Sequence, residues 1–192
     1  FATVTETQTD KTATTTYYTD GPLTLPQGFD IGTFATGLGK VRVLLEVPDG
    51  GLLASLPNEG KVVYLSDDNG DGKADTNIVV VKGLQRPHGL QLLCGSEESC
   101  LLYVAEENQV TRFDYILLEH TAVNGQKLFD LPTGGNHWTR TILIAEIDGQ
   151  QKLLTSVGST CNVCIEDDWR RAVILISELD GSDLRPYTTG PV

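Results

Sequence analysis

The sequence contains no methionine, has no long apolar run and is poor in basic residues. Its 14 lysines and arginines face 26 aspartates and glutamates, which gives a net charge of −12. This balance argues against a nucleic-acid partner, because phosphates are bound by clusters of lysine and arginine. The missing methionines remove thioether ligands and flexible gap-filling side chains. Because no apolar stretch is long enough to cross a bilayer, no membrane span is predicted.

Several motifs that mark common enzyme classes are also missing. The chain has no Gly-x-Ser-x-Gly elbow, no phosphate-binding glycine loop and no dinucleotide fingerprint, which disfavours hydrolases, kinases and NAD-dependent enzymes. No segment keeps a helical period for three turns, so no long helix is predicted.

The four cysteines fall into two close pairs. Cys94 and Cys100 flank a short polar stretch between two apolar runs, which predicts a disulfide that staples a hairpin. Cys161 and Cys164 form Cys-x-x-Cys, which predicts a tight loop disulfide, with a reduced redox pair or half of a metal site as the alternative. Close, even pairing favours disulfides and hence an extracellular or periplasmic location.

The N-terminal segment differs from the rest of the chain. Nine of its first 20 residues are threonine, and it has too few apolar residues to offset its ordering entropy. We predict a surface tail over residues 1–22, with an edge strand added to a sheet as the alternative.

From residue 23 to residue 192 the chain repeats short apolar runs separated by Gly, Pro, Asp and Asn, which predicts an all-β fold. The runs group into units of roughly 45 to 55 residues, the period of a four-stranded propeller blade. Roughly three to four blades fit into this portion, with a β-sandwich as the structural alternative. An open arc would expose sheet edges, so we expect missing C-terminal blades or a partner chain to complete the propeller.

An acidic stretch carries the pattern Asp-x-Asn-x-Asp-Gly, the first half of a calcium-binding loop. Oxygen ligands at alternate positions can wrap a hard cation, and a glycine permits the sharp turn between them. The candidate ligands are Asp67, Asn69, Asp71 and Asp75. The bidentate glutamate of a full EF-hand loop is missing, since residue 78 is Ile. A hairpin turn with solvated carboxylates is the alternative.

Two histidines precede predicted strands. His137 follows Gly134 and Gly135, which allow a ligand to approach the backbone closely. An imidazole can take a proton from a hydroxyl, so His137 is a candidate general base, with a capping histidine in a turn as the alternative. His88 stands in Arg-Pro-His-Gly-Leu, where a hydrogen-bonded structural role is the alternative to a functional one.

Six motifs together resemble one family. They are Leu25-Pro-Gln-Gly-Phe, Pro48-Asp-Gly-Gly-Leu-Leu, Asp71-Gly-Lys-Ala-Asp, Gly83-Leu-Gln-Arg-Pro-His-Gly-Leu, His137-Trp-Thr-Arg-Thr and Val157-Gly-Ser-Thr-Cys-Asn-Val-Cys. The chain is similar to the soluble quinoprotein sugar dehydrogenases, particularly the L-sorbosone dehydrogenase-like branch, from about residue 23 to its end.

The resemblance implies a six-bladed β-propeller that binds pyrroloquinoline quinone (PQQ) and calcium on its top face and oxidises the anomeric hydroxyl of an aldose. It assigns the catalytic base to His137. Arg140, close to this histidine, and His88 are the candidate cofactor contacts. Ser159 stands where the glucose dehydrogenase branch has an aspartate that orients the histidine, so that support is expected to be weaker or supplied otherwise. The chain also lacks the later blades with most of the cofactor site. The alternative function is therefore a non-catalytic, extracellular, propeller-derived binding or assembly module.

Overall fold

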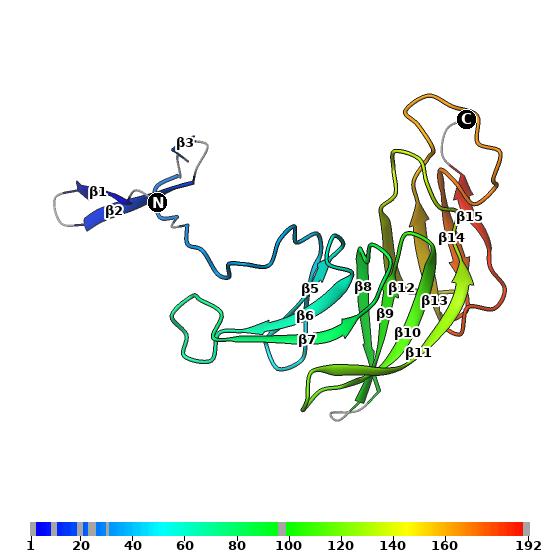
Figure 1. The fold of residues 1–192 in the computed structure, drawn as a ribbon, viewed down its shortest axis with the longest axis horizontal. Coiled ribbons are helices and arrows are strands. Elements are labelled where there is room, and N and C mark those ends of the chain that lie inside the picture. The colour runs from blue at the N-terminus through cyan, green and yellow to red at the C-terminus, as the bar shows by residue number, and fades with distance from the viewer. Residues whose placement is uncertain are drawn as a thin grey trace.

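The computed structural model describes residues 3–8, 11–18, 21–22, 26–29, 31–95 and 99–189. All regular elements in these residues are strands (Figure 1). They are β1 (Thr3–Gln8), β2 (Lys11–Tyr18), β3 (Gly21–Pro22), β4 (Leu44–Glu46), β5 (Leu52–Leu56), β6 (Lys61–Ser66), β7 (Thr76–Lys82), β8 (Gly89–Cys94), β9 (Ser99–Ala105), β10 (Gln109–Ile116), β11 (Thr121–Asp130), β12 (Arg140–Ile147), β13 (Gln150–Val157), β14 (Val173–Ser177) and β15 (Arg185–Thr189). No helix long and apolar enough to cross a membrane occurs in these ranges.

Three four-stranded antiparallel sheets follow one another along the chain, β4–β7, β8–β11 and β12–β15. Their first strands begin at residues 44, 89 and 140, which matches the predicted repeat. The first strand of the middle sheet, β8, contacts both β4 and β12. Adjacent first strands of consecutive sheets are the arrangement of propeller blades around an axis. The β-propeller prediction is thus confirmed, with three blades in the described residues.

The threonine-rich segment contains strands of its own. β1, β2 and β3 pair antiparallel with one another in a separate three-stranded sheet. Alternating β-branched residues suit such a sheet. The segment therefore does not add an edge strand to any of the three blades.

The blades pack face to face through alternating side chains, as β9 shows most clearly. Leu102 and Val104 belong to the core shared with the first blade, whereas Tyr103 and Ala105 belong to the core shared with the third. Successive side chains of a strand point to opposite faces, so a central blade must be apolar on both. The Tyr103 hydroxyl also donates to the Leu179 carbonyl at 3.1 Å, which links the second blade to the third.

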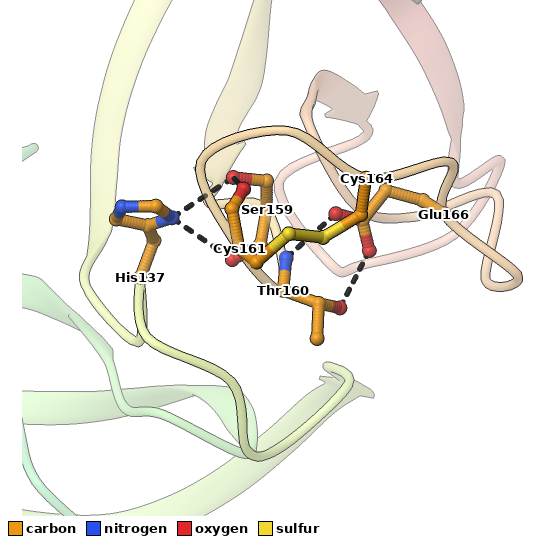
Figure 2. The surroundings of a disulfide bond; sticks show 6 residues. All are labelled: His137, Ser159, Thr160, Cys161, Cys164 and Glu166. Atoms are coloured by element: carbon orange, nitrogen blue, oxygen red, sulfur yellow. Dashed lines mark hydrogen bonds between the residues drawn. A yellow bond between two sulfur atoms is a disulfide. The ribbon is translucent and has the colours of Figure 1, made fainter.

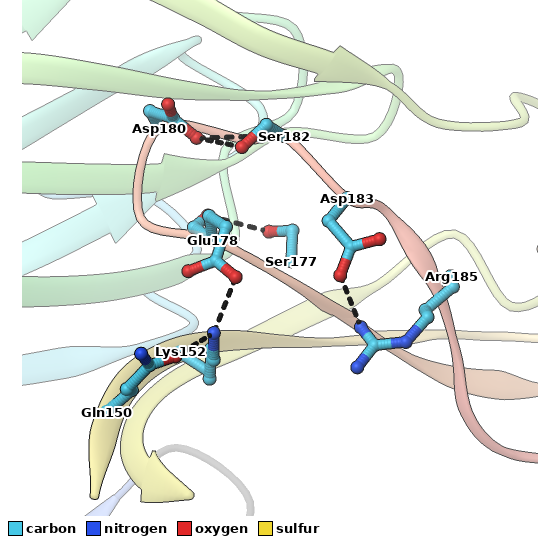
Figure 3. Close-up of polar contacts among 8 residues, drawn as sticks. All are labelled: Gln150, Lys152, Ser177, Glu178, Asp180, Ser182, Asp183 and Arg185. Carbon is cyan, nitrogen blue, oxygen red and sulfur yellow. Dashed lines mark hydrogen bonds and ion pairs between the residues drawn. The ribbon is translucent and has the colours of Figure 1, made fainter. Parts of the chain in front are cut away.

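The loops lie at two ends of the blades. We call the end at which β8 and β12 begin the upper end. Because consecutive strands of a blade are antiparallel, loops 83–88, 106–108, 131–139 and 158–172 all lie at this end. The lower end contains loops 47–51, 67–75, 117–120 and 178–184. At the lower end of the third blade, Lys152 pairs with Glu178 and Arg185 pairs with Asp183 (Figure 3).

Both predicted disulfides are present. Cys94 and Cys100 are paired across β8 and β9 and bonded at the lower end of the second blade. Cys161 and Cys164 are bonded within the upper loop 158–172. The cysteine spacing therefore predicted the pairing correctly.

Candidate active site

The loop between β11 and β12 carries His137 and is shaped by two glycines. Gly134 and Gly135 have φ angles of +78° and +84°, in the region that glycine adopts most readily. A Cβ at Gly135 would lie 2.9 Å from the Cα of Thr160. Only glycine lets the two upper loops of the third blade touch here, which places His137 against loop 158–172.

His137 is held by Ser159 from that neighbouring loop (Figure 2). Its Nδ1 lies 2.9 Å from the Ser159 hydroxyl oxygen and 3.2 Å from the Ser159 carbonyl oxygen. Gly158 makes this approach possible, because a Cβ there would lie 2.3 Å from the His137 carbonyl oxygen. The support expected at this position is thus supplied by the serine itself.

Two of the ties within the Ser159 loop lie next to the serine (Figure 2). The Cys161–Cys164 disulfide closes its tip. The Glu166 carboxylate accepts hydrogen bonds from the backbone N–H and the hydroxyl of Thr160, both at 2.6 Å. The hydroxyl bond is the main reason why the pKa of Glu166 is lowered, with smaller contributions from the Arg171 and His137 charges. The carboxylate therefore stays ionised in the mildly acidic range and keeps the loop closed.

Arg140 lies beneath His137 and has no solvent exposure. Its guanidinium donates to the carbonyls of Pro132 at 2.7 Å and of His137 and Thr139 at 3.0 Å. Burial, together with the nearby charge of Arg171, lowers the pKa of Arg140 to about 10. Its donors point into the loop that carries the histidine. The predicted cofactor contact of Arg140 therefore gains no support from these contacts, which give it a positioning role.

His88 is also buried, with 9% of its surface exposed. Its Nδ1 lies 3.0 Å from the Arg140 carbonyl oxygen, so Nδ1 carries the proton, since a carbonyl only accepts. Burial is the main cause that lowers the pKa of His88, which keeps the ring neutral. The ring meets Trp138 edge-on. These contacts agree with a hydrogen-bonded structural role for His88. They do not test its cofactor contact, which stays a prediction.

A cluster of cations surrounds Trp138 next to the base. The Arg86 guanidinium lies 3.8 Å from the Trp138 ring centroid, and the Arg42 guanidinium lies 5.8 Å from it. Arg86 is paired with Glu107 at 2.9 Å, whereas Arg42 forms no ion pair with any residue that the structure describes. Sequence reasoning missed this cluster. Their positions in the repeat could have revealed it. Arg42, His88 and Trp138 each stand one or two residues before the first strand of a blade, so they lie at the same end of adjacent strands.

The four predicted calcium ligands lie in loop 67–75 at the lower end of the first blade, away from His137. Asp67 accepts the backbone N–H groups of Gly70, Asp71 and Gly72. Asp75 accepts those of Asp68 and Asn69. No group of three or more His, Cys, Asp or Glu side chains that could hold a metal ion occurs in the part of the chain described. Calcium in this loop stays a prediction. An ion bound here would lie at the opposite end of the blades from His137.

Glu107 connects the second blade to the His137 loop, and we expect this connection to weaken in acid. Its carboxylate accepts the Gly134 N–H at 3.1 Å and pairs with Arg86. Burial acts to raise its pKa, but these bonds outweigh burial, and the pKa is lowered overall. Because the pKa of Glu107 is lower in the folded protein than in the unfolded chain, the ionised carboxylate stabilises the fold at every pH above the unfolded-state pKa. This stabilisation is lost as the pH falls through the folded-state pKa.

We expect Glu107→Gln to lower the free energy of unfolding by about 1–2 kcal/mol at pH 7, with a smaller difference from the original protein below about pH 4. Urea unfolding at several pH values measures this. Glu119→Gln, which changes an exposed carboxylate in a lower loop, is the matched control and should cost less than about 0.5 kcal/mol. An equal difference at every pH would contradict the assignment.

Comparison with known protein families matches residues 23–173 to the family described as TrAA12-like. The PQQ domain of pyranose dehydrogenase from Coprinopsis cinerea is similar with 22% identity and a TM-score of 0.68, covering 85% of this chain and 39% of that chain. The carbohydrate-active enzyme of family AA12 from Trichoderma reesei has 25% identity and a TM-score of 0.61, over 80% and 39%.

The PQQ-bound aldose sugar dehydrogenase from Streptomyces coelicolor has 18% identity and a TM-score of 0.57, over 84% of this chain and 52% of that chain. The chain thus spans about two fifths to one half of these structures. A search of curated protein sequences found no significant match. The structural likenesses agree with the propeller fold derived above.

Proposed function

The chain belongs to the TrAA12-like family, and on this premise we propose that it is the base-bearing part of a PQQ-dependent enzyme that oxidises an aldose-type sugar at its anomeric hydroxyl. The observation that carries the proposal is the setting of His137. Ser159 engages its Nδ1, while Nε2 forms no hydrogen bond with any described residue. Nε2 is therefore the nitrogen that can accept a proton from a sugar hydroxyl.

In this mechanism the protein positions the sugar and takes one proton. His137 Nε2 removes the proton of the anomeric hydroxyl as the C–H bond breaks, as a general base does. The resulting imidazolium keeps its Nδ1 contacts with the hydroxyl and carbonyl oxygens of Ser159. Bound PQQ would supply the two-electron acceptor for the hydride.

The residues at the upper end fit a flat, anionic cofactor. PQQ carries carboxylates, and carboxylates are bound best by arginine. Arg42 and Arg86 lie beside Trp138, and the buried Nη1 of Arg171 has no hydrogen-bond partner. These cations gather next to His137 although the chain has a net charge of −12. Arg42, Arg86 and Arg171 would therefore contribute to holding PQQ.

The rest of the cofactor site would come from blades outside this sequence or from a partner chain. The PQQ domain from Coprinopsis cinerea is more than twice as long as the region that it shares with this chain, and the PQQ-bound enzyme from Streptomyces coelicolor is nearly twice as long. Calcium at the cofactor would need ligands other than loop 67–75, which lies at the other end of the blade. The protein has two disulfides, and disulfides persist in oxidising compartments. We therefore place the enzyme outside the cytoplasm.

A dye-reduction assay with PQQ and Ca²⁺ tests this function. We expect reduction of an electron-accepting dye with free aldoses, and a loss of at least about 100-fold with the matching 1-O-methyl glycosides, which lack the anomeric hydroxyl. A parallel titration follows quenching of tryptophan fluorescence by PQQ. Equal rates with both sugar sets would contradict anomeric oxidation. No PQQ binding, together with concentration-dependent self-association, would favour the non-catalytic assembly module.

A further inference from the structure

The hydrogen bonds around Ser159 fix which nitrogen of His137 carries the proton. The Ser159 hydroxyl oxygen lies 2.8 Å from the Cys161 carbonyl oxygen, and a carbonyl can only accept, so the hydroxyl proton is used there. The same oxygen lies 2.9 Å from His137 Nδ1. Because a hydroxyl has one proton, Nδ1 must donate in this second bond. The neutral ring is therefore the Nδ1–H tautomer, and Nε2 has a free lone pair.

The carbonyl that accepts the hydrogen bond of the Ser159 hydroxyl belongs to Cys161, the first cysteine of the disulfide (Figure 2). The other loop ties act on Thr160, which bonds to Glu166 and accepts the Asn136 N–H at 2.8 Å. These bonds hold the base of the loop, and none of them involves residues of the Cys161–Cys164 segment. The disulfide is thus the covalent constraint on the peptide group that faces Ser159.

We propose that the Cys161–Cys164 disulfide is a positioning element for the His137 base, acting through Ser159. With the disulfide closed, Ser159 is an acceptor toward Nδ1, and Nε2 is the base. When the bond is opened, the Cys161 carbonyl can turn away, and the Ser159 hydroxyl can rotate to donate to Nδ1. That arrangement stabilises the Nε2–H tautomer, in which the nitrogen assigned to the chemistry holds a proton.

The disulfide is accessible to an external thiol reagent. Cys164 is exposed, and its neighbours Val163 and Ile165 are 94% and 85% exposed. An external dithiol would open the bond by thiolate attack on one cysteine sulfur, which releases the other cysteine, and its second thiol would then attack the mixed disulfide and release the first cysteine. The two cysteines gain two electrons and two protons, and the dithiol becomes a cyclic disulfide. The effect on His137 is partial, because the Ser159 carbonyl still accepts at 3.2 Å.

The inference rests on the proposed function only where it calls His137 a base, so its main test does not require activity. The ¹⁵N chemical shifts of the neutral His137 ring report the tautomer. We expect Nδ1–H alone in the original protein and a mixture with Nε2–H in the Cys161→Ser/Cys164→Ser variant. The matched control is Cys94→Ser/Cys100→Ser, which opens the lower disulfide and should leave the His137 tautomer unchanged.

Dithiothreitol added to the original protein gives a second route if the double variant folds poorly, and the Cys94→Ser/Cys100→Ser protein treated in the same way isolates the upper disulfide. In an active preparation, opening it should lower kcat by about 3- to 10-fold without changing KM. An unchanged tautomer in a folded protein with the upper disulfide open would overturn the inference. A tautomer shift in a protein that never oxidises sugars would support it and would instead count against the proposed function.

Discussion

Replacing His137 by glutamine is expected to lower kcat for aldose oxidation by about 10²–10⁴-fold, the usual contribution of a general base. Glutamine places a polar amide at about the distance of Nε2 from the backbone. This amide cannot accept a proton, so the variant removes the base and keeps a polar group where Nε2 lies. Steady-state dye reduction with saturating PQQ and Ca²⁺ measures kcat and KM separately.

A histidine at the lower end supplies the matched control. His120 stacks on Tyr64 with ring centroids 3.5 Å apart and bonds to the Tyr115 hydroxyl, at the far end of the blades from His137. His120→Gln should lower stability and leave kcat within about twofold. A His137→Gln enzyme that keeps its original kcat would remove the base from the mechanism, and a raised KM alone would reduce His137 to a binding residue.

The fold could be predicted from the sequence because its signals are local and repeated. Apolar runs with period two, separated by turn residues, predict strands, and their grouping predicts blades. The cysteine spacing likewise predicts both disulfides, since Cys94 and Cys100 face each other across one hairpin. The number of blades around the axis is less local and came only from the family resemblance.

The candidate site was harder to predict, because its contacts join distant segments. His137 was found from its glycines, but the Ser159 contact spans 22 residues, and the bond from His88 to the Arg140 carbonyl spans 52. Arg140 illustrates the limit. Its place beside the base suggested a ligand contact, whereas packing closes it off from solvent. Sequence position alone does not tell whether an arginine turns toward a ligand or toward the backbone.

Replacing Arg140 by methionine is expected to lower the free energy of unfolding by about 2–4 kcal/mol. Removal of the guanidinium breaks a buried hydrogen bond to the Pro132 carbonyl and two half-buried ones to the carbonyls of His137 and Thr139. A buried, unsatisfied polar group costs roughly 1–3 kcal/mol, and a half-buried one costs less. Methionine fills similar space, and losing a charge that burial disfavours offsets part of this cost. Arg140→Lys should also be destabilising, because an ammonium does not offer the planar fork that reaches carbonyls on two sides.

Urea unfolding measures the change, with Arg185→Met as the matched control. Arg185 pairs with Asp183 at 3.0 Å, but both side chains are more than half exposed, so its loss should cost less than about 1 kcal/mol. If Arg140→Met and Arg185→Met destabilise equally, Arg140 does not organise the loop. If Arg140→Met is destabilised as expected and His137 also loses its single tautomer, the same buried guanidinium holds both the fold of the loop and the aim of the base.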